Sequence, residues 1–445
     1  TLSNPKWNSM IEPEDRLHPI GVFDSGVGGL TVVAALRELL PSEKIYYIGD
    51  TARVPYGGKS RQTVERYSIE ISGLLLAEEA KAIVVACNTV SSIAMDRLRA
   101  KFGDIPVLGV LEAGVEVRVL LAPEHGMTGQ QDGDQVADSR DEASGLPVYS
   151  LYAGGNRRLS DEAAAGLDAL VFDVQDAGAR FYTYISTLGY AMEEAARRKL
   201  AFYVLDRPNP INGVRVEGPM LDGEALSFVG YHRLPLRHAM TVGELARLFN
   251  QEKAIRAELH VVEMRGWQRG DWFDSTGLVW VDPSPNLRSL NAALLYPAVA
   301  MLEFTPDYSV GRGTDAPFEQ IGAPWIDGRQ LAADLNGRYI PGVRVYATRF
   351  RPASSNCAGV LVEGVRFVIT DREAFSAQRL GLEIAAAVWR LYPGKLPLEA
   401  NRRLIGSTKV IEAIQAGRDP RAIEQESQDA LAEFLAARQK HLLYK

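Results

Sequence analysis

Short apolar runs alternate with helical patterns over most of this chain, and this alternation constrains its fold more than any other feature. In KAIVVACNT, ALVFDVQDAG and LAFYVLDRPNP, a run that predicts a buried strand ends in a cluster of polar residues. Strands that alternate with helices build parallel sheets covered by helices, so the sequence predicts the α/β class. Ligands bind such sheets at the carboxyl ends of the strands, which makes the polar clusters candidate sites.

The same pattern, followed along all 445 residues, predicts three domains. Parallel-sheet patterns span 1–112 and 113–326, and residues 327–445 predict a smaller α+β domain. In this last part VRVYATRFRP, CAGVLVEG and VRFVITDR predict strands, and the charged stretch 419–445 predicts a surface helix. The polar stretch 126–144 predicts a long loop, and long loops in compact domains are often functional.

Composition argues against several classes of function. The net charge is −7 and no long basic run occurs, so we expect no nucleic-acid partner. Two distant cysteines do not make a disulfide framework, and no apolar stretch of about 18 residues predicts membrane insertion. The polar first twenty residues do not form a signal peptide, which favours a cytoplasmic location. The histidines lack the spacing of a metal site, so we expect no metal and no cofactor.

Three motifs near the N-terminus follow one another in a family-specific order: GVFDSGVGG at 21–29, GDTARVPYG at 49–57 and ACNT at 86–89. Residues 19–110 thereby resemble glutamate racemase. The resemblance implies that Cys87 is one of the two cysteine bases of that family. A thiol between a strand end and a helix N-terminus is also expected to have a lowered pKa. The resemblance further implies residues that hold the amino acid: Asp24, Ser25, Asn88 and Thr89.

The second half of a racemase is missing from this sequence. That half carries a GCTHYP-type motif in the family, whereas Cys357 lies in SSNCAGV with no Thr-His beside it. With one base absent, nothing delivers a proton to the opposite face of the amino acid. We therefore expect no racemase activity, and the alternative role of Cys87 is that of a buried cysteine at the end of a sheet.

A second series of motifs covers most of the remaining chain. It includes APEHG at 122–126, FDVQDAGARFYTYI at 172–185, LDRPNPING at 205–213, SVGRGT at 309–314 and PFEQIGAPW at 317–325. From about Val115 to Pro393 the sequence resembles the exo-β-N-acetylmuramidase family. The resemblance implies a Rossmann-like domain, a smaller C-terminal domain and a site in the cleft between them. It also implies release of N-acetylmuramic acid from the non-reducing ends of peptidoglycan fragments, with muropeptides or disaccharides as binding partners.

One element of that family is replaced in this chain. Family members open with a βα unit that carries a VGLVTNPTG-like segment before the APEHG strand. Here the racemase-like piece stands in its place, with a junction near residues 111–119. The chain therefore resembles a fusion, and the loss of the unit would leave a sheet edge unpaired.

Glycoside hydrolysis usually needs two carboxyl groups that flank the scissile bond. Glu124 is the candidate acid, because partial desolvation after the apolar run VRVLLAP would favour its protonated form. His125 could hydrogen-bond Glu124 or the sugar. Asp176 is the candidate second carboxylate, and its alternative roles are a helix cap or a salt bridge to Arg180.

Further residues are candidates for binding the sugar. Arg180 could pair with the lactyl carboxylate that distinguishes muramic acid from glucosamine, or form a structural ion pair. Tyr182 and Tyr184 could contact the sugar, or pack in the core. Arg312 lies between two glycines and could clamp an anion. The remaining candidates are Asp206, Arg207, Asn209, Asn212, Glu217 and Glu319.

Three hypotheses follow from the sequence. The first is an exo-acting glycosidase, which the long series of motifs favours. The second is glutamate racemase, which the missing second cysteine disfavours. The third is a non-catalytic fusion that binds muropeptides. The sequence does not fix the oligomeric state or whether the sugar configuration is retained.

Overall fold

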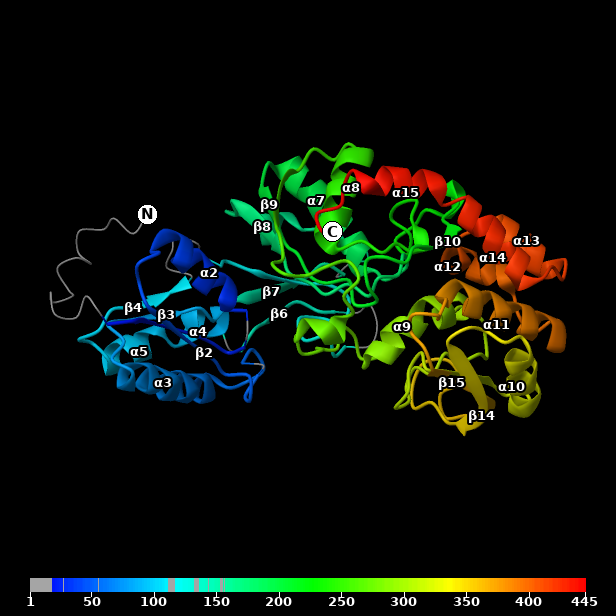
Figure 1. Cartoon of the computed structure of the whole chain (residues 1–445), viewed down its shortest axis with the longest axis horizontal. Coiled ribbons are helices and arrows are strands. Elements are labelled where there is room, and N and C mark those ends of the chain that lie inside the picture. The colour runs from blue at the N-terminus through cyan, green and yellow to red at the C-terminus, as the bar shows by residue number, and fades with distance from the viewer. Residues whose placement is uncertain are drawn as a thin grey trace. The chain divides into compact units, whose positions relative to one another are not determined.

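The chain forms two units, which a computed structural model describes over most of their length (Figure 1). Unit 1 comprises Thr1–Leu121 with Ala137–Ser150, and unit 2 comprises Ala122–Val136 with Leu151–Lys445. The three domain ranges proposed from the sequence stay predictions. The described residues are 18–26, 28–54, 56–110, 117–131, 136–142, 144–152, 155 and 157–445.

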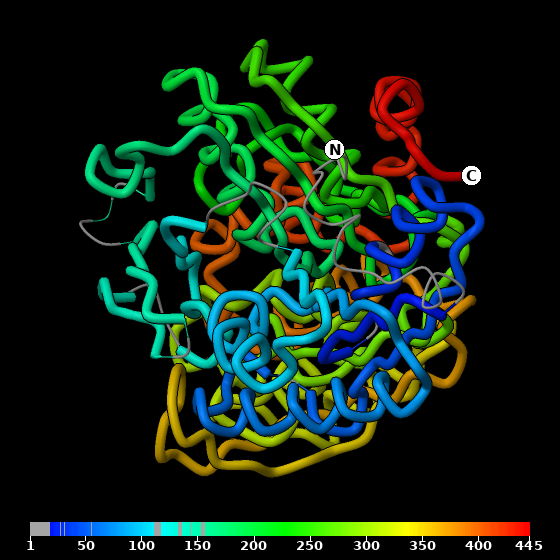
Figure 2. The backbone as a smooth tube through the Cα atoms, turned by 90° about the vertical axis from the view of Figure 1, so that its left-hand side faces the viewer, coloured from blue at the N-terminus to red at the C-terminus, as the bar shows by residue number. Residues whose placement is uncertain are grey.

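Unit 1 is built on a parallel four-stranded sheet with helices on both faces. Its elements are β1 (Ile20–Asp24), α2 (Leu30–Leu39), β2 (Ile45–Gly49), α3 (Arg61–Ala77), β3 (Ala82–Val85), α4 (Asn88–Ile93), α5 (Met95–Lys101) and β4 (Val107–Gly109). The strand order is β2-β1-β3-β4, and the apolar strands β1 and β3 are buried in the middle. Helix α2 lies on one face of the sheet, and α3 and α5 lie on the other (Figures 1 and 2). Leu36 of α2 packs on the first face, and Leu75 and Leu98 pack on the second. The predicted parallel sheet is therefore present.

A short sheet follows in the chain, with the strand order β5-β7-β6. Its strands are β5 (Leu120–Ala122), β6 (Ser139–Arg140) and β7 (Pro147–Ser150). The strand predicted over EVRVLLAPEHG is thus confined, among the described residues, to its last apolar positions. Glu124 follows it after one proline, as the sequence predicts.

The parallel sheet of unit 2 brings two further polar clusters together. Its strands β8 (Ala169–Phe172), β9 (Ala201–Leu205) and β12 (Glu258–Val262) lie in the order β12-β9-β8. Phe172 pairs with Val204 and Leu205 with Val262, so the three strands end at one edge. The other elements of this part are α6 (Asp161–Ala164), α7 (Tyr184–Arg198), β10 (Glu217–Met220), β11 (Pro235–Arg237) and α8 (Val242–Glu252). Helices α7 and α8 pack on the sheet, which confirms the α/β class (Figure 1).

The C-terminal part of unit 2 contains an antiparallel sheet in the order β13-β15-β14. Its elements are α9 (Leu290–Val299), β13 (Gln320–Ala323), α10 (Gly328–Gly337), β14 (Val343–Phe350), β15 (Val362–Ile369) and α11 (Ala377–Leu391). The strand predicted over CAGVLVEG is wrong before Val362. Cys357 and Gly359 adopt φ of +62° and +74°, and a strand cannot continue through left-handed residues.

The end of the chain returns to the parallel sheet, so the prediction of a simple surface helix needs correction. Helices α12 (Arg402–Ile405), α13 (Thr408–Gln415), α14 (Pro420–Asp429) and α15 (Ala432–Gln439) lead to the final residues. The Tyr444 hydroxyl donates to Asp206 Oδ2 at 2.6 Å, directly after β9. The backbone N–H of Leu443 donates to Glu244 of α8 at 2.9 Å. These buried partners could not be inferred from the charge pattern of the tail.

Arg180 joins the two parts of unit 2 from within. Its guanidinium donates to the carbonyl oxygens of Pro219 and Leu234, and to those of Leu404 and Ile405 at 2.7 and 3.1 Å. The side chain is fully buried, and burial lowers its pKa to about 9. A buried cation is tolerated only when its donors are paired, so these carbonyls hold the loop before α7 against α12.

Gly406 lets Arg180 occupy this position. It has a φ of +86°, and a Cβ there would lie 2.7 Å from the Arg180 guanidinium carbon. We expect Gly406→Ala to lower the free energy of unfolding by about 2–4 kcal/mol, because it combines backbone strain with displacement of a buried charge.

Gly417→Ala is the matched control. Gly417 has a φ of +70°, but no atom lies within 4 Å of its Cβ position, so only about 1 kcal/mol of strain is expected. Urea unfolding followed by circular dichroism measures both variants. Equal losses of stability in the two variants would contradict the role given to Arg180.

Candidate functional site

Glu124 is held by the first turn of α7. The Thr183 hydroxyl donates to Glu124 Oε2, and the Glu124 side chain is half-buried. The Tyr184 hydroxyl lies 3.0 Å from the Glu124 carbonyl oxygen and 2.6 Å from that of Pro283. The Thr183 side chain makes no capping hydrogen bond to α7, and its hydroxyl contacts the carboxylate instead. The carboxyl group after β5 is therefore fixed by side chains from a different element.

His125 stabilises the loop that follows Glu124. It has a φ of +70°, and its Nδ1 lies 2.7 Å from the Gln131 carbonyl oxygen. Nδ1 must be the donor to a carbonyl, so the neutral ring leaves Nε2 as an acceptor. No hydrogen bond between His125 and Glu124 is present. The expected contact with Glu124 is thus replaced by one that closes the loop.

Tyr182 and Tyr184 are buried, so the structure supports packing for both. Their rings meet edge to face at 4.9 Å, and Tyr182 also contacts Tyr296 of α9 at 5.8 Å. Burial raises the pKa of each of the three phenols. The charges of Glu303, Glu124 and Asp176 further raise the pKa of Tyr296. Both candidate carboxylates therefore act electrostatically on this one phenol.

Asp176 follows β8 and is 3% exposed. Its Oδ2 accepts the Gly178 N–H at 2.8 Å and lies 3.3 Å from His238 Nε2. His238 Nδ1 accepts the Met240 N–H, so the neutral ring carries its proton on Nε2, toward Asp176. Asp176 Oδ1 is buried without a hydrogen-bond partner. Neither alternative role, a cap of α7 or a salt bridge to Arg180, is present.

Arg180 cannot bind a substrate carboxylate in this structure. Its guanidinium is fully buried and is engaged by backbone carbonyls, as described above. Neither Asp173 nor Asp176 pairs with it. The expected role of Arg180 is corrected to a structural one, and the physical reason is its position beneath α12.

The cluster after β9 is divided between the surface and the interior. Arg207 pairs with Asp173 at 2.6 Å, because β8 and β9 end side by side, and both side chains are exposed. Asp206 accepts from the Thr241 hydroxyl and the Gly243 N–H, each at 2.7 Å. Burial raises the Asp206 pKa. Asp206 thus anchors the N-terminus of α8, a structural contact rather than an open binding position.

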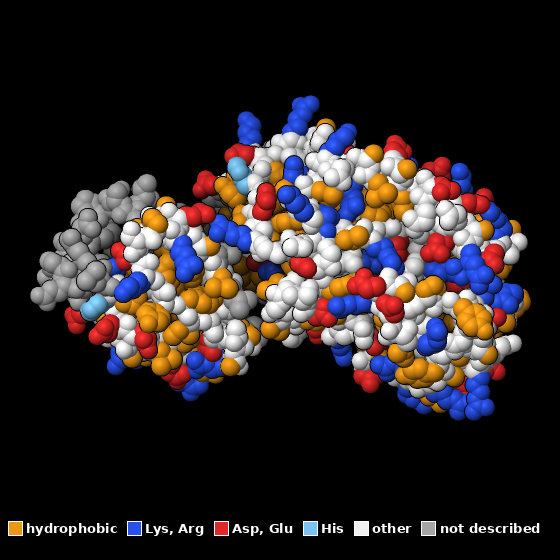
Figure 3. Space-filling model, in the orientation of Figure 1, with side chains coloured by type: hydrophobic (Ala, Val, Ile, Leu, Met, Phe, Trp, Pro, Cys, Tyr) orange, Lys and Arg blue, Asp and Glu red, His pale blue; other side chains and the backbone are white. Residues whose placement is uncertain are grey.

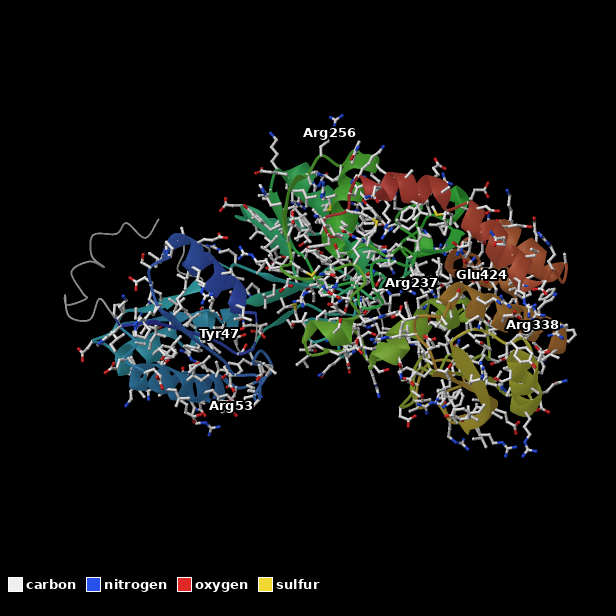
Figure 4. The ribbon with its side chains drawn as sticks, in the orientation of Figure 1. Tyr47, Arg53, Arg237, Arg256, Arg338 and Glu424 are labelled. Atoms are coloured by element: carbon white, nitrogen blue, oxygen red, sulfur yellow. The ribbon has the colours of Figure 1, made fainter. Side chains whose placement is uncertain are left out.

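Three further candidates lie in the interior. Asn209 donates to the Met240 carbonyl, and Asn212 accepts the N–H of Val214. Glu217 accepts from Arg237 at 3.2 Å and from the Gln378 N–H at 2.9 Å. Figure 4 labels Arg237 at this position in unit 2. These contacts stabilise the fold, so cleft-lining roles for Asn209, Asn212 and Glu217 are not supported.

Arg312 and Glu319 each contact a polar partner. Arg312 forms an ion pair of 2.6 Å with Glu303, between two glycines with positive φ. Glu319 accepts from the Ser289 hydroxyl at 2.7 Å, and Ser289 also caps α9, the helix that carries Tyr296. Both side chains remain partly exposed, and their substrate roles stay predictions.

The racemase-like residues of unit 1 also come together. Asp24 ends β1 and accepts the N–H groups of Ser25 and Gly29 at 2.7 and 2.9 Å. Cys87 lies between β3 and α4, and its thiol donates to the Ser25 hydroxyl at 3.3 Å. Asn88 and Thr89 form the first turn of α4, where Asn88 is exposed.

The expected pKa of Cys87 was wrong in direction. Burial raises the pKa of its thiol, and the charge of Asp24 adds to this. Helix α4 has six residues, and its N-terminus does not outweigh the desolvation. Burial likewise raises the pKa of Tyr47 to about 12; this residue is labelled in Figure 4, and its hydroxyl donates to the Gly26 carbonyl.

Three contributors to the site were missed from the sequence: Thr183, His238 and Tyr296. Thr183 lies between two tyrosines at the start of a helix. A threonine at such a position predicts an N-capping role rather than a contact with a carboxylate. His238 was considered only as a metal ligand. Thr183 and His238 each lie more than fifty residues from the carboxylate that they contact, so no spacing in the sequence indicates these contacts.

The other features of the described residues do not form a second candidate site. No group of three His, Cys, Asp or Glu among them could hold a metal ion, and none of their helices is long and apolar enough to cross a bilayer. Two surface depressions of about 490 and 320 Å³ lie along α7 and α8, away from the candidate carboxylates. Arg256 lines the larger one (Figure 4), and acidic and basic side chains are interspersed over this face (Figure 3).

Comparison with known proteins identifies relatives of both parts of the chain. The family model for Exo-beta-N-acetylmuramidase NamZ, N-terminal, matches residues 104–291, and its C-terminal counterpart matches 294–444. Peptidoglycan beta-N-acetylmuramidase NamZ of Bacillus subtilis is 42% identical over 334 residues, which are 74% of this chain and 80% of that protein. A solved DUF1343 family protein from Bacteroides fragilis superposes with a TM-score of 0.67 and 33% identity, over 76% of this chain and 90% of its own.

The N-terminal part has a different relative. Glutamate racemase of Chlorobaculum tepidum is 57% identical over 101 residues, which are 23% of this chain. The chain spans 37% of that racemase. Both resemblances drawn from the motifs are thereby confirmed.

The raised pKa of Cys87 has a measurable consequence. Only a thiolate is alkylated readily, so a thiol with a raised pKa reacts slowly at neutral pH and faster as the pH rises. In a Cys357→Ser background, we expect the iodoacetamide rate at Cys87 to keep rising above pH 9. Mass spectrometry of the tryptic peptide follows the reaction. A rate that reaches its plateau below pH 8 would show a thiolate and contradict this assignment.

Proposed function

The chain belongs to the NamZ family of exo-β-N-acetylmuramidases, and from this we propose that it is a glycoside hydrolase that releases N-acetylmuramic acid from the non-reducing ends of peptidoglycan fragments. The relative in Bacillus subtilis is named a peptidoglycan β-N-acetylmuramidase, and the likeness covers four fifths of it. The substrates would be muropeptides or disaccharides that begin with N-acetylmuramic acid.

The contact between Glu124 and Thr183 carries this proposal. A general acid must keep one orientation while it passes between its protonated and charged forms. The Thr183 hydroxyl can donate to a carboxylate and accept from a carboxylic acid, so it holds Oε2 in either form. Helix α7 fixes Thr183 three residues after the buried Arg180. Glu124 is therefore positioned by a rigid element, although it lies on a loop.

Asp176 is the proposed second carboxylate. Its Oδ2 is held by Gly178 and faces His238, while Oδ1 is a buried acceptor without a hydrogen-bond partner. Such an atom needs a donor, and a water molecule or a substrate hydroxyl would supply one. Burial raises the pKa of Tyr296, and the charges of Glu124 and Asp176 add to this shift. A glycosidase of this kind would use the two carboxyl groups on either side of one glycosidic bond.

The alternatives have weaker support. A racemase needs a second base on the opposite face of its amino acid, and the chain spans little more than a third of its racemase relative. A fusion that binds muropeptides without cleaving them would keep the same contacts but release no sugar. Turnover therefore separates this third hypothesis from the proposal.

Glu124→Gln tests the role of the acid. The amide keeps the shape of the side chain but cannot donate a proton, so we expect kcat to fall about 10²- to 10⁴-fold on a natural disaccharide. The loss should be smaller on 4-nitrophenyl N-acetyl-β-muramide, because nitrophenolate leaves without full protonation. The control is Glu258→Gln, at an exposed position of β12. Equal losses on both substrates would contradict the general-acid role, and no release by wild-type protein would contradict the proposed function.

A further inference from the structure

A buried histidine lies beside Asp176, the proposed second carboxylate. His238 is fully buried, and its Nε2 lies 3.3 Å from Asp176 Oδ2. The backbone brings the two residues together, because Ala179 forms an antiparallel bridge with Arg237, the last residue of β11. The segment after β8 and the segment after β11 therefore run side by side, and each contributes one of the two side chains.

The turn after β11 fixes the position of the proton on the His238 ring. Nδ1 accepts the Met240 N–H at 3.2 Å, so the neutral ring carries its proton on Nε2, the atom that contacts Asp176. Nε2 makes no aligned hydrogen bond with a described residue. Hydrogen bonds of catalytic groups are often long or poorly aligned before substrate binds, and the contact of 3.3 Å fits this pattern.

The same turn is held in a conformation that alanine adopts only under constraint. Ala239 has a φ of +53° and is fully buried. Its carbonyl oxygen accepts hydrogen bonds of 2.8 Å from Arg269 and from Arg438 of α15. Strained residues of this kind persist where their surroundings over-determine them, and they cluster at functional sites. The two arginines therefore keep His238 in place against backbone strain.

One oxygen of Asp176 is engaged by the protein, and the other is not. Oδ2 accepts the Gly178 N–H at 2.8 Å and faces His238. Gly178 has a φ of +82°, and a Cβ there would lie 2.7 Å from Asn209 Oδ1, so this donor requires glycine. Oδ1 is buried and has no hydrogen-bond partner among the described residues. Since a buried acceptor needs a donor, Oδ1 is the oxygen that a substrate hydroxyl or a water molecule would contact.

We infer that His238 is a positioning residue of the glycosidase site, which holds Asp176 by Oδ2 and so directs Oδ1 toward the reacting sugar or water. This inference rests on the proposed function. The Gly178 N–H alone would leave the carboxylate some rotation about its Cβ–Cγ bond, because a single hydrogen bond fixes one atom rather than a plane. A second donor, from a different segment of the chain, restricts that rotation.

Two substitutions of His238 separate this role from a role in the turn. The glutamine nitrogen can take the place of Nε2 and keep a donor near Asp176, whereas the shorter asparagine can keep only the acceptor for Met240. On a disaccharide that begins with N-acetylmuramic acid, we expect His238→Asn to lower kcat by about 10²-fold and His238→Gln by less than about tenfold, because a catalytic group misplaced by about 1 Å costs about 10²-fold. KM should change by less than about threefold in both, since the loss is confined to the transition state.

His232→Asn is the matched control. His232 also lies beside a carboxylate, with its Nε2 2.6 Å from Glu252 Oε2 at the end of α8, and the substitution should leave kcat unchanged. Wild-type kcat in His238→Asn would overturn the inference. A loss in His238→Gln at least as large as that in His238→Asn would overturn it as well, because the ring would then serve the turn rather than the carboxylate.

A measurement on the unsubstituted ring covers the case in which these variants do not fold. In ¹⁵N-labelled wild-type protein near neutral pH, the His238 signals are those that shift in Asp176→Asn, and they should show a protonated Nε2 and a bare Nδ1. A proton on Nδ1 would overturn the inference. Wild-type protein that releases no N-acetylmuramic acid would contradict the proposed function itself, whereas turnover that survives in His238→Asn contradicts only the role of His238.

Discussion

The buried guanidinium of Arg180 is the interaction on which the rest of unit 2 depends. A charge removed from water destabilises the folded state by several kcal/mol unless its donors are satisfied. Here backbone carbonyls from two separate segments satisfy them, and Gly406 leaves the necessary room. Arg180 therefore fixes the start of α7 relative to α12. Because Thr183 and Tyr184 follow within one turn, the same constraint positions the partners of Glu124.

Much of the fold could be predicted, because it follows from local patterns. Apolar runs that end in polar clusters correctly predicted the parallel strands, and strand pairing placed Asp173 beside Arg207. The environment of each polar side chain could not be predicted in this way. The sequence shows that Arg180 is charged, but not that carbonyls from residues 404 and 405 surround it. Cys87 illustrates the same limit, since its desolvation depends on packing that the sequence does not reveal.

Units 1 and 2 differ in how many of the motifs of their respective families they carry. Unit 1 retains the strand-end residues of a racemase but has no second catalytic cysteine motif. Unit 2 carries the motifs of the muramidase, and β8 lies at the edge of its parallel sheet among the described residues. Tyr444 donates to Asp206 directly after β9, the middle strand of this sheet, and so ties the end of the chain to it.

The order in which sugars are released tests the central claim most directly. A defined peptidoglycan tetrasaccharide with N-acetylmuramic acid at its non-reducing end would be incubated with the protein and followed by mass spectrometry. The account predicts free N-acetylmuramic acid and a trisaccharide as the first products. It also predicts no cleavage of the oligomer that begins with N-acetylglucosamine. Release of N-acetylglucosamine, or internal cleavage to disaccharides, would contradict it.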